Sequence, residues 1–132
     1  MRIFTDTSAF YALLDRDDAN HRRAKTTWAD LLDAENTLVT SNYILVESFA
    51  LLQNRLGIGA VRGLQGDILP LINIDFVTSE VHRSAVAALL SASRRGLSLV
   101  DCASFEVMRA SGIKTSFTFD PHFKEQGFTI LP

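Results

Sequence analysis

The sequence contains a single cysteine, Cys102, so no disulfide can form within the chain. Its three histidines, at positions 21, 82 and 122, match no zinc-binding spacing. No apolar run approaches the roughly 18 residues that a transmembrane helix needs, and Asp6 interrupts the N-terminal segment too early for a signal peptide. These absences predict a protein of a reducing compartment, the cytoplasm, with no membrane association. They also leave Cys102, which lies in an apolar helical stretch, as an expected core residue.

The sequence also lacks an excess of positive charge and an internal boundary. Thirteen Lys and Arg residues oppose fifteen Asp and Glu residues, and this net charge of −2 gives no overall attraction to nucleic acid or anionic lipid. With only three prolines and seven glycines, no linker, repeat or low-complexity tract divides the chain. Because domains usually have about 100–200 residues, we expect residues 1–132 to form a single domain.

Short β-rich runs alternate with longer helical patterns along the chain. The β-rich runs predict strands at residues 3–5, 37–40, 71–77, 115–119 and 128–131. Helical spacing of apolar residues predicts helices over residues 8–14, 24–32, 42–56, 79–92 and 98–111, a weaker one over 57–70 and a short one from Pro121. This alternation is typical of the α/β class and predicts a three-layer α/β/α sandwich around a central, mainly parallel sheet.

Three helices carry recognisable end signals. Ser41 or Asn42 is expected to cap the helix that runs to Leu56. This helix is apolar on almost every side, which predicts that it is buried. Ser79 is expected to cap the next long helix, and Gly112 to end the one that begins near residue 98.

Four carboxylates stand in apolar surroundings, with no cationic residue placed nearby in the sequence to pair with them: Asp6, Glu47, Asp101 and Asp120. Desolvation is costly for an ionised carboxylate, so each one must find a partner or be protonated. Asp6 and Asp120 fall at the ends of predicted strands and Asp101 at the start of a helix, the edge where α/β proteins bind ligands. Glu47 can project toward the same edge. Hard oxygen donors that converge there predict a Mg²⁺ or Mn²⁺ site.

Each of these acids also has a purely structural interpretation. Asp6, Asp101 and Asp120 each stand where a helix cap is expected. Glu47 has no capping role, so its structural alternative is a buried ion pair with a distant arginine. Asp75 is also a lone acid in an apolar run, but it shares its strand face with another polar residue and is expected to face solvent.

In order along the chain, four segments resemble the motifs of the PIN-domain family, most closely the toxin ribonucleases of bacterial VapBC toxin–antitoxin systems. The segments are residues 5–9 (TDTSA), 46–48 (VES), 97–102 (LSLVDC) and 118–123 (TFDPHF). The resemblance covers nearly the whole chain. It implies a metal-dependent endoribonuclease that cuts single-stranded RNA, forms a homodimer and is inhibited by a small VapB-like antitoxin.

The resemblance also implies roles for individual residues. Asp6 and Asp101 match the principal metal ligands, and Glu47 and Asp120 complete the acidic cluster that binds Mg²⁺ or Mn²⁺ and acts in catalysis. Two hydroxyl residues match positions close to the substrate beside that cluster: Ser8 and Thr118.

Three other functions remain open on the residues alone. A phospho-receiver domain needs a second acid beside Asp6 and a lysine near the last strand, and both are missing. A haloacid-dehalogenase-like phosphatase needs an acid two residues after Asp6, where Ser8 stands. The third is a PIN-like RNA-binding module without catalysis, which the presence of all four acids disfavours.

Substrate and partner contacts are less sharply marked. The pairs Arg22–Arg23 and Arg94–Arg95 are candidate phosphate contacts, with an ordinary solvated surface as the alternative. Three aromatic residues are candidates for a partner groove, with ordinary core packing as the alternative: Phe10, Tyr11 and Phe49.

Overall fold

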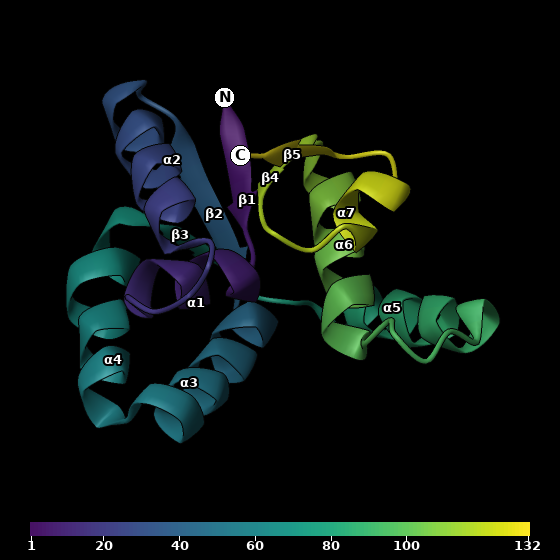
Figure 1. Cartoon of the computed structure of the whole chain (residues 1–132). Helices are drawn as coiled ribbons and strands as arrows, with labels where there is room; N and C mark the ends of the chain where they lie inside the picture. Colours follow the sequence, from purple (N-terminus) through teal and green to yellow (C-terminus); the bar gives the residue numbers. More distant parts are fainter.

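A central sheet of five parallel strands, in the order β3-β2-β1-β4-β5, organises the computed structural model, which describes Met1 to Pro132. The strands are β1 (Arg2–Thr5), β2 (Thr37–Ser41), β3 (Asn73–Asp75), β4 (Thr115–Phe117) and β5 (Thr129–Leu131). β1 pairs with both β2 and β4 and so lies in the middle of the sheet (Figure 1). The predicted central parallel sheet is confirmed.

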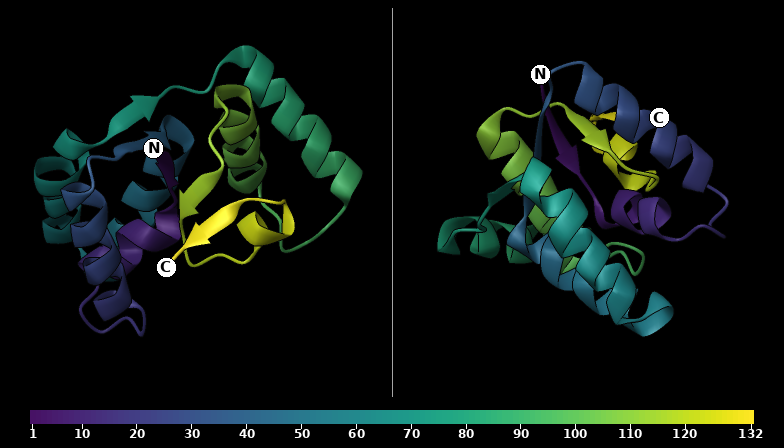
Figure 2. Two further views of the ribbon diagram at one scale, coloured as in Figure 1. Left: turned by 90° about the horizontal axis from the view of Figure 1, so that it is seen from above. Right: turned by 90° about the vertical axis from the view of Figure 1, so that its left-hand side faces the viewer.

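Helices cover both faces of this sheet, and α2 and α6 lie on opposite sides of the strands (Figure 2). The helices are α1 (Thr7–Leu14), α2 (His21–Asp33), α3 (Asn42–Leu56), α4 (Ile58–Gly63), α5 (Ser79–Ala92), α6 (Leu99–Ser111) and α7 (His122–Glu125). A π-helical turn, η1 (Leu64–Ile68), and a 3-10 turn, η2 (Leu69–Leu71), connect α4 to β3. None of the helices combines the length and the apolar character required to cross a bilayer.

Most of the predicted helix ends are observed. The Ser41 hydroxyl accepts a hydrogen bond from the backbone N–H of Ile44 and caps α3. α6 ends at Gly112, which has a φ of 67° that favours glycine. The prediction for α5 is wrong by one residue, because the capping hydroxyl belongs to Thr78 and Ser79 is the first helical residue.

The strand predicted over residues 71–77 is shorter than expected. η2 takes up Leu71, because Pro70 fixes its own φ and lacks an N–H for strand pairing. The remaining strand, β3, lies at the sheet edge, pairs with β2 alone and is exposed throughout. Its residue Asp75 faces solvent, as predicted.

A cluster of aromatic rings joins the carboxyl-terminal helices to the middle of the sheet. Phe4 of β1 and Phe123 of α7 are fully buried, with ring centroids 6.4 Å apart. The Phe105 ring of α6 meets Phe123 edge-on at 5.0 Å, and Phe128 packs beside both. These contacts fix the start of α7, and the loop before it, against β1 and β4.

The predicted burial of α3 is observed on one side only, where Ile44, Ser48 and Leu52 are buried. α3 packs against α1, α4 and α6, but no element covers its outer face. Val46 is therefore 72% exposed, and Phe76, which follows β3, is 68% exposed. Both line a shallow apolar cavity of about 420 Å³ together with Asn42, Leu45 and Phe49.

Of the aromatic candidates for a partner groove, Phe10 is excluded because it is fully buried, whereas Phe49 lies in this cavity.

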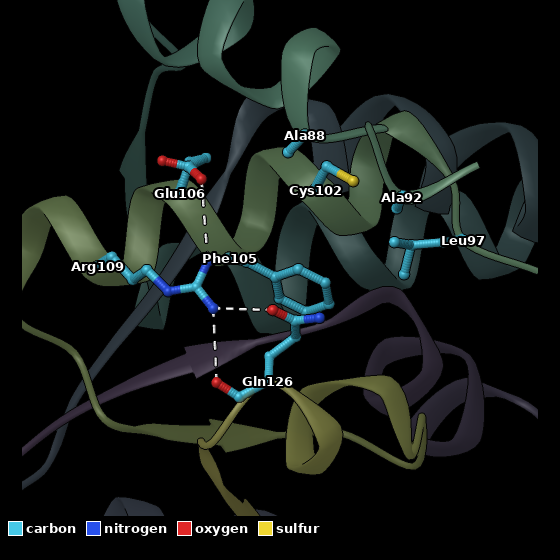
Figure 3. A pocket seen from close by; sticks show the side chains of 8 residues that line it. All are labelled: Ala88, Ala92, Leu97, Cys102, Phe105, Glu106, Arg109 and Gln126. Carbon is cyan, nitrogen blue, oxygen red and sulfur yellow. Dashed lines mark hydrogen bonds and ion pairs between the residues drawn. The ribbon is translucent and has the colours of Figure 1, made fainter. Parts of the chain in front are cut away.

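A second cavity, of about 220 Å³, lies between α5 and α6 and contains Cys102 (Figure 3). The thiol belongs to the core, as predicted, since only 2% of this residue is exposed. Burial raises the pKa of Cys102, and the nearby carboxylates raise it further, so the thiolate needed for nucleophilic chemistry is disfavoured. Arg109 closes this cavity by donating a 2.9 Å hydrogen bond to the side chain of Gln126.

Candidate active site

The strand order reverses at the carboxyl ends of β1 and β4, and we call this edge of the sheet, together with the loop and helix ends around it, the crevice. From β1 the chain proceeds to β2 and β3 on one side, and then crosses to β4 and β5 on the other. Ligands of open parallel sheets bind at such a reversal of strand order. Asp6 directly follows β1, and Asp120 lies in the loop that follows β4. The topology therefore brings these two predicted site residues to the same edge of the sheet, Asp6 after β1 and Asp120 after the neighbouring strand β4.

Asp6 is buried in this crevice, with 5% of its surface exposed. Its Oδ2 atom accepts hydrogen bonds from the Ser8 hydroxyl at 2.7 Å, from the Ser8 backbone N–H at 3.3 Å and from the Thr118 hydroxyl at 3.0 Å. The capping interpretation of Asp6 is correct, since the Ser8 amide belongs to the first turn of α1. The same carboxylate faces the crevice, so capping and a site role coexist.

Ser8 and Thr118 connect Asp6 to the loop that carries Asp120. The Ser8 hydroxyl accepts a 2.9 Å hydrogen bond from the N–H of Phe119. The Thr118 hydroxyl accepts one of 2.9 Å from the N–H of Asp120. Both hydroxyls therefore lie beside Asp6 and Asp120, close to the acidic residues as the resemblance implied. Their hydrogen bonds join the start of α1 to the loop after β4.

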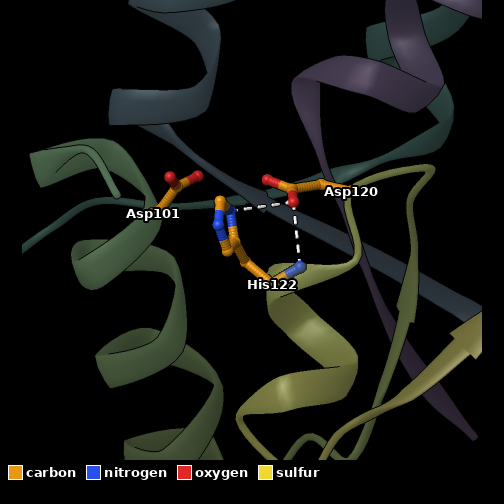
Figure 4. Close-up of side chains that lie close together, drawn as sticks. All are labelled: Asp101, Asp120 and His122. Atoms are coloured by element: carbon orange, nitrogen blue, oxygen red, sulfur yellow. Dashed lines mark hydrogen bonds and ion pairs between the residues drawn. The ribbon is translucent and has the colours of Figure 1, made fainter. Parts of the chain in front are cut away.

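Asp101 enters the crevice from the first turn of α6. Its Oδ2 atom accepts a 3.0 Å hydrogen bond from the Ser98 N–H, and the Ser98 hydroxyl accepts one of 3.0 Å from the Asp101 N–H. This is the capping box that the spacing predicted. The carboxylate nevertheless points toward Asp120 and His122 (Figure 4). Possible metal-binding atoms of these three residues all lie within 4.8 Å of one another.

His122 is a site residue that sequence reasoning missed. Its Nδ1 atom lies 3.0 Å from Oδ1 of Asp120, and its backbone N–H donates a 2.9 Å hydrogen bond to the same oxygen. Its spacing from the other two histidines gives no sign of this role. The usable signal was the position of His122 two residues after Asp120, within the fourth segment of the resemblance.

Glu47 is half-buried on α3 and has no cationic partner. The ion pairs in the structure lie elsewhere: Arg94 with Glu125, Arg109 with Glu106, and His122 with Asp120. The alternative of a buried ion pair with an arginine is therefore wrong. The Thr7 hydroxyl interacts with Glu47 and lowers its pKa, but burial outweighs this effect and raises the pKa.

Burial and neighbouring negative charge both act on the carboxylates of the crevice. Burial raises the pKa of Asp6 from 3.8 to about 6, and raises the pKa of Glu47 and Asp101 as well. The negative charge of Asp120 raises the pKa of all three further. No lysine or arginine forms an ion pair with any of the four. Carboxylate oxygens with one imidazole are a donor set that fits Mg²⁺ or Mn²⁺.

Comparisons with known proteins agree with this architecture. The family model of the PIN domain matches residues 3–128. The 23S rRNA-specific endonuclease VapC20 of Mycobacterium tuberculosis is 35% identical over 127 residues, which cover 96% of this chain and 95% of that protein.

Solved structures extend the likeness. The crystal structure of VapC20, described as a sarcin-ricin loop cleaving toxin, has a TM-score of 0.87 at 34% identity and covers 98% of this chain and 99% of its own. VapBC2 from Rickettsia felis has a TM-score of 0.73 at 14% identity, covering 98% of this chain and 97% of its own. FitAcB from Neisseria gonorrhoeae has a TM-score of 0.71 at 15% identity, covering 100% and 97%. These last two show the fold alone.

Proposed function

The chain belongs to the PIN-domain family, and on that basis we propose that it is a toxin endoribonuclease that hydrolyses phosphodiester bonds in RNA, with residues 1–132 acting as one PIN domain. The observation that carries the proposal is the crevice, where the negative charge of Asp120 acts on Asp6, Glu47 and Asp101 and no lysine or arginine forms an ion pair with any of the four. The 35% identity to a 23S rRNA-specific endonuclease, over nearly the full length of both chains, supports the same activity and suggests ribosomal RNA as the substrate.

The acidic cluster would hold Mg²⁺ or Mn²⁺ through Asp6, Glu47, Asp101 and Asp120. Such an ion supplies a water of lowered pKa and positive charge beside the phosphoryl oxygens. The chain's own contribution is orientation, because the hydroxyls of Ser8 and Thr118 hold the Asp6 carboxylate in place. The surrounding chain also shields the Asp6 carboxylate from bulk water, since only 5% of this residue is exposed.

Two protein partners belong to the proposal: a small antitoxin that inhibits cleavage, and a second copy of the chain. The toxin description of VapC20 and the resemblance to VapBC toxins support an antitoxin, and RNA cleavage would take place in the cytoplasm. The exposed apolar face of α3 around Val46, Phe49 and Phe76 gives the chain a surface that a partner can cover.

Chelation of divalent ions should stop cleavage. We expect a labelled RNA hairpin that carries a sarcin–ricin loop to be cut in Mg²⁺ or Mn²⁺, to stay intact in excess EDTA, and to be cut again when the ion is restored in excess. Denaturing gels follow the products. Undiminished cleavage in EDTA would contradict the metal requirement, and RNA binding without cleavage in either ion would favour a non-catalytic module.

Cation binding should also weaken as the pH falls through about 6, because burial raises the pKa of Asp6 to that value and protons then compete with the ion. Below this pH we expect the Mn²⁺ affinity to fall by about tenfold per pH unit, as measured by titration calorimetry. The variant Thr118→Val removes a hydrogen bond that lowers the pKa of Asp6, so it should move the midpoint to higher pH. An affinity that is constant between pH 5 and 7.5 would contradict this assignment.

A further inference from the structure

Beside the acidic crevice, the corner between α1 and α2 forms a polar cavity of about 460 Å³. We call it the arginine corner, and its lining residues are Arg16, Asp18, Ala19, His21, Arg22 and Arg23. Three arginines thus line one cavity in a chain whose net charge is −2. Such a concentration of arginine calls for an anionic ligand.

The arginines of this corner are not used in ion pairs. The α1–α2 loop contains three aspartates, yet none of them forms an ion pair with an arginine. Two of these acids accept hydrogen bonds from the loop backbone instead. Asp15 accepts one from the N–H of Asp17, and Asp18 accepts one from the N–H of Asn20. The guanidinium donors therefore remain available to a ligand.

Arg23 links the arginine corner to the acidic crevice. Its guanidinium lies over the Phe119 ring, 5.7 Å from the centroid, a cation–π contact that orients it. Phe119 precedes Asp120, and its N–H donates to the Ser8 hydroxyl that binds Asp6. The arginine corner and the carboxylates are thus joined through one residue and lie at the same edge of the sheet.

The first turn of α2 adds to the positive potential. Asn20 makes no side-chain cap hydrogen bond, and no acidic residue occupies that turn. The start of the helix faces the carboxyl edge of the sheet, because α2 begins beside α1 and runs back toward the start of β2 (Figure 1). The positive end of its dipole therefore supplements the three arginines.

We propose that the arginine corner, through Arg16, Arg22 and Arg23, binds the RNA backbone phosphates that flank the scissile bond. This inference rests on the nuclease function proposed above. Guanidinium forks match phosphate oxygens in pairs. The lining contains only one apolar residue, Ala19, so the cavity lacks the apolar anchor pocket that a protein partner requires.

The test compares Arg16→Gln, Arg22→Gln and Arg23→Gln with the control Lys114→Gln. Lys114 is exposed and precedes β4, at the opposite end of the sheet. Its replacement therefore removes one positive charge, as each arginine variant does, but far from the crevice. The probe is a fluorescein-labelled RNA hairpin with a sarcin–ricin loop, held in EDTA so that it is bound without being cut. Fluorescence anisotropy at several salt concentrations gives the affinity and its salt dependence.

We expect each arginine variant to bind the hairpin about three- to tenfold more weakly than the control. The slope of log affinity against log salt should fall by about 0.7 for each lost phosphate contact, a change that a merely structural defect does not produce. In Mg²⁺ the KM should rise by a similar factor while kcat is retained. Arg23→Lys, which keeps the charge, should recover part of the affinity.

Two failures are distinguishable. A wild-type chain that binds the hairpin but never cuts it contradicts the nuclease proposal and leaves the arginine corner standing. A wild-type chain that cuts it, with all three variants equal to the control in affinity, salt slope and KM, overturns the arginine corner alone. If the wild-type chain neither binds the RNA in EDTA nor cuts it in Mg²⁺ or Mn²⁺, both are wrong.

Discussion

Replacing Asp6 with asparagine should abolish RNA cleavage while the fold remains intact. Asparagine keeps the size of the side chain and an oxygen that can accept the hydrogen bonds from Ser8 and Thr118, but it removes the negative charge. Residues that only support a metal ligand typically contribute about 10–100-fold to metal affinity or activity. Because Asp6 is itself a proposed ligand, we expect Asp6→Asn to lower the cleavage rate by more than about 100-fold. Initial rates on a labelled hairpin measure this loss.

Asp101→Asn should cause a similar loss, because a possible metal-binding oxygen of this carboxylate lies within 4.8 Å of those of Asp120 and His122. The matched control is Asp75→Asn. Asp75 lies exposed on the edge strand β3, so its replacement removes one negative charge without touching the crevice. Cleavage at the wild-type rate by either Asp6→Asn or Asp101→Asn would falsify the assignment of the acidic cluster as the active site.

The same Asp6 variant should make the metal-free protein more stable. In the folded chain burial raises the pKa of Asp6 from 3.8 to about 6. A raised carboxyl pKa means that the native state holds its proton more tightly, so stability is lost as the pH rises from about 4 to about 6. Above that range the charged form costs about 3 kcal/mol. Denaturant unfolding should show Asp6→Asn to be more stable than wild type at pH 7.5, with little difference near pH 4.

Replacing Phe123 with alanine should destabilise the fold strongly. Its ring is fully buried and contacts those of Phe4, Phe105 and Phe128. Removing such a ring leaves a cavity and typically costs roughly 3–5 kcal/mol, which urea unfolding can measure. Phe76→Ala is the matched control, because this ring is 68% exposed and its loss should change the free energy of unfolding by at most about 0.5 kcal/mol. Equal effects of both substitutions would contradict the assigned core.

The acidic cluster could be predicted from the sequence because its signal is local. Asp6 and Asp101 each stand alone among apolar neighbours, next to a strand end or a helix start, and parallel strands bring such positions to one edge. His122 could not be identified this way. Its place two residues after Asp120 is the one local signal, but its distance from Asp101 depends on how close the loop after β4 comes to the start of α6, which no short-range pattern reports.

The exposed face of α3 was mispredicted for a related reason. An apolar sequence shows that a helix avoids water, but it does not show whether the chain has another element to cover it. The elements of this chain cover one side of α3 and leave Val46 exposed. The edge strand β3 is shorter than predicted because Pro70 places Leu71 in the 3-10 turn η2, which precedes it.

The hydrogen bonds around Asp6 are unequally shared between its two oxygens. All three of them reach Oδ2, so the carboxylate is held in one rotamer while Oδ1 keeps its lone pairs free of these contacts. Immobilising a flexible side chain typically costs about 0.5–1.5 kcal/mol of conformational entropy on binding. Here the hydroxyls of Ser8 and Thr118 immobilise it when the chain folds. The Asp6 carboxylate is therefore preorganised, and a cation bound beside it would meet an oxygen whose orientation is already fixed.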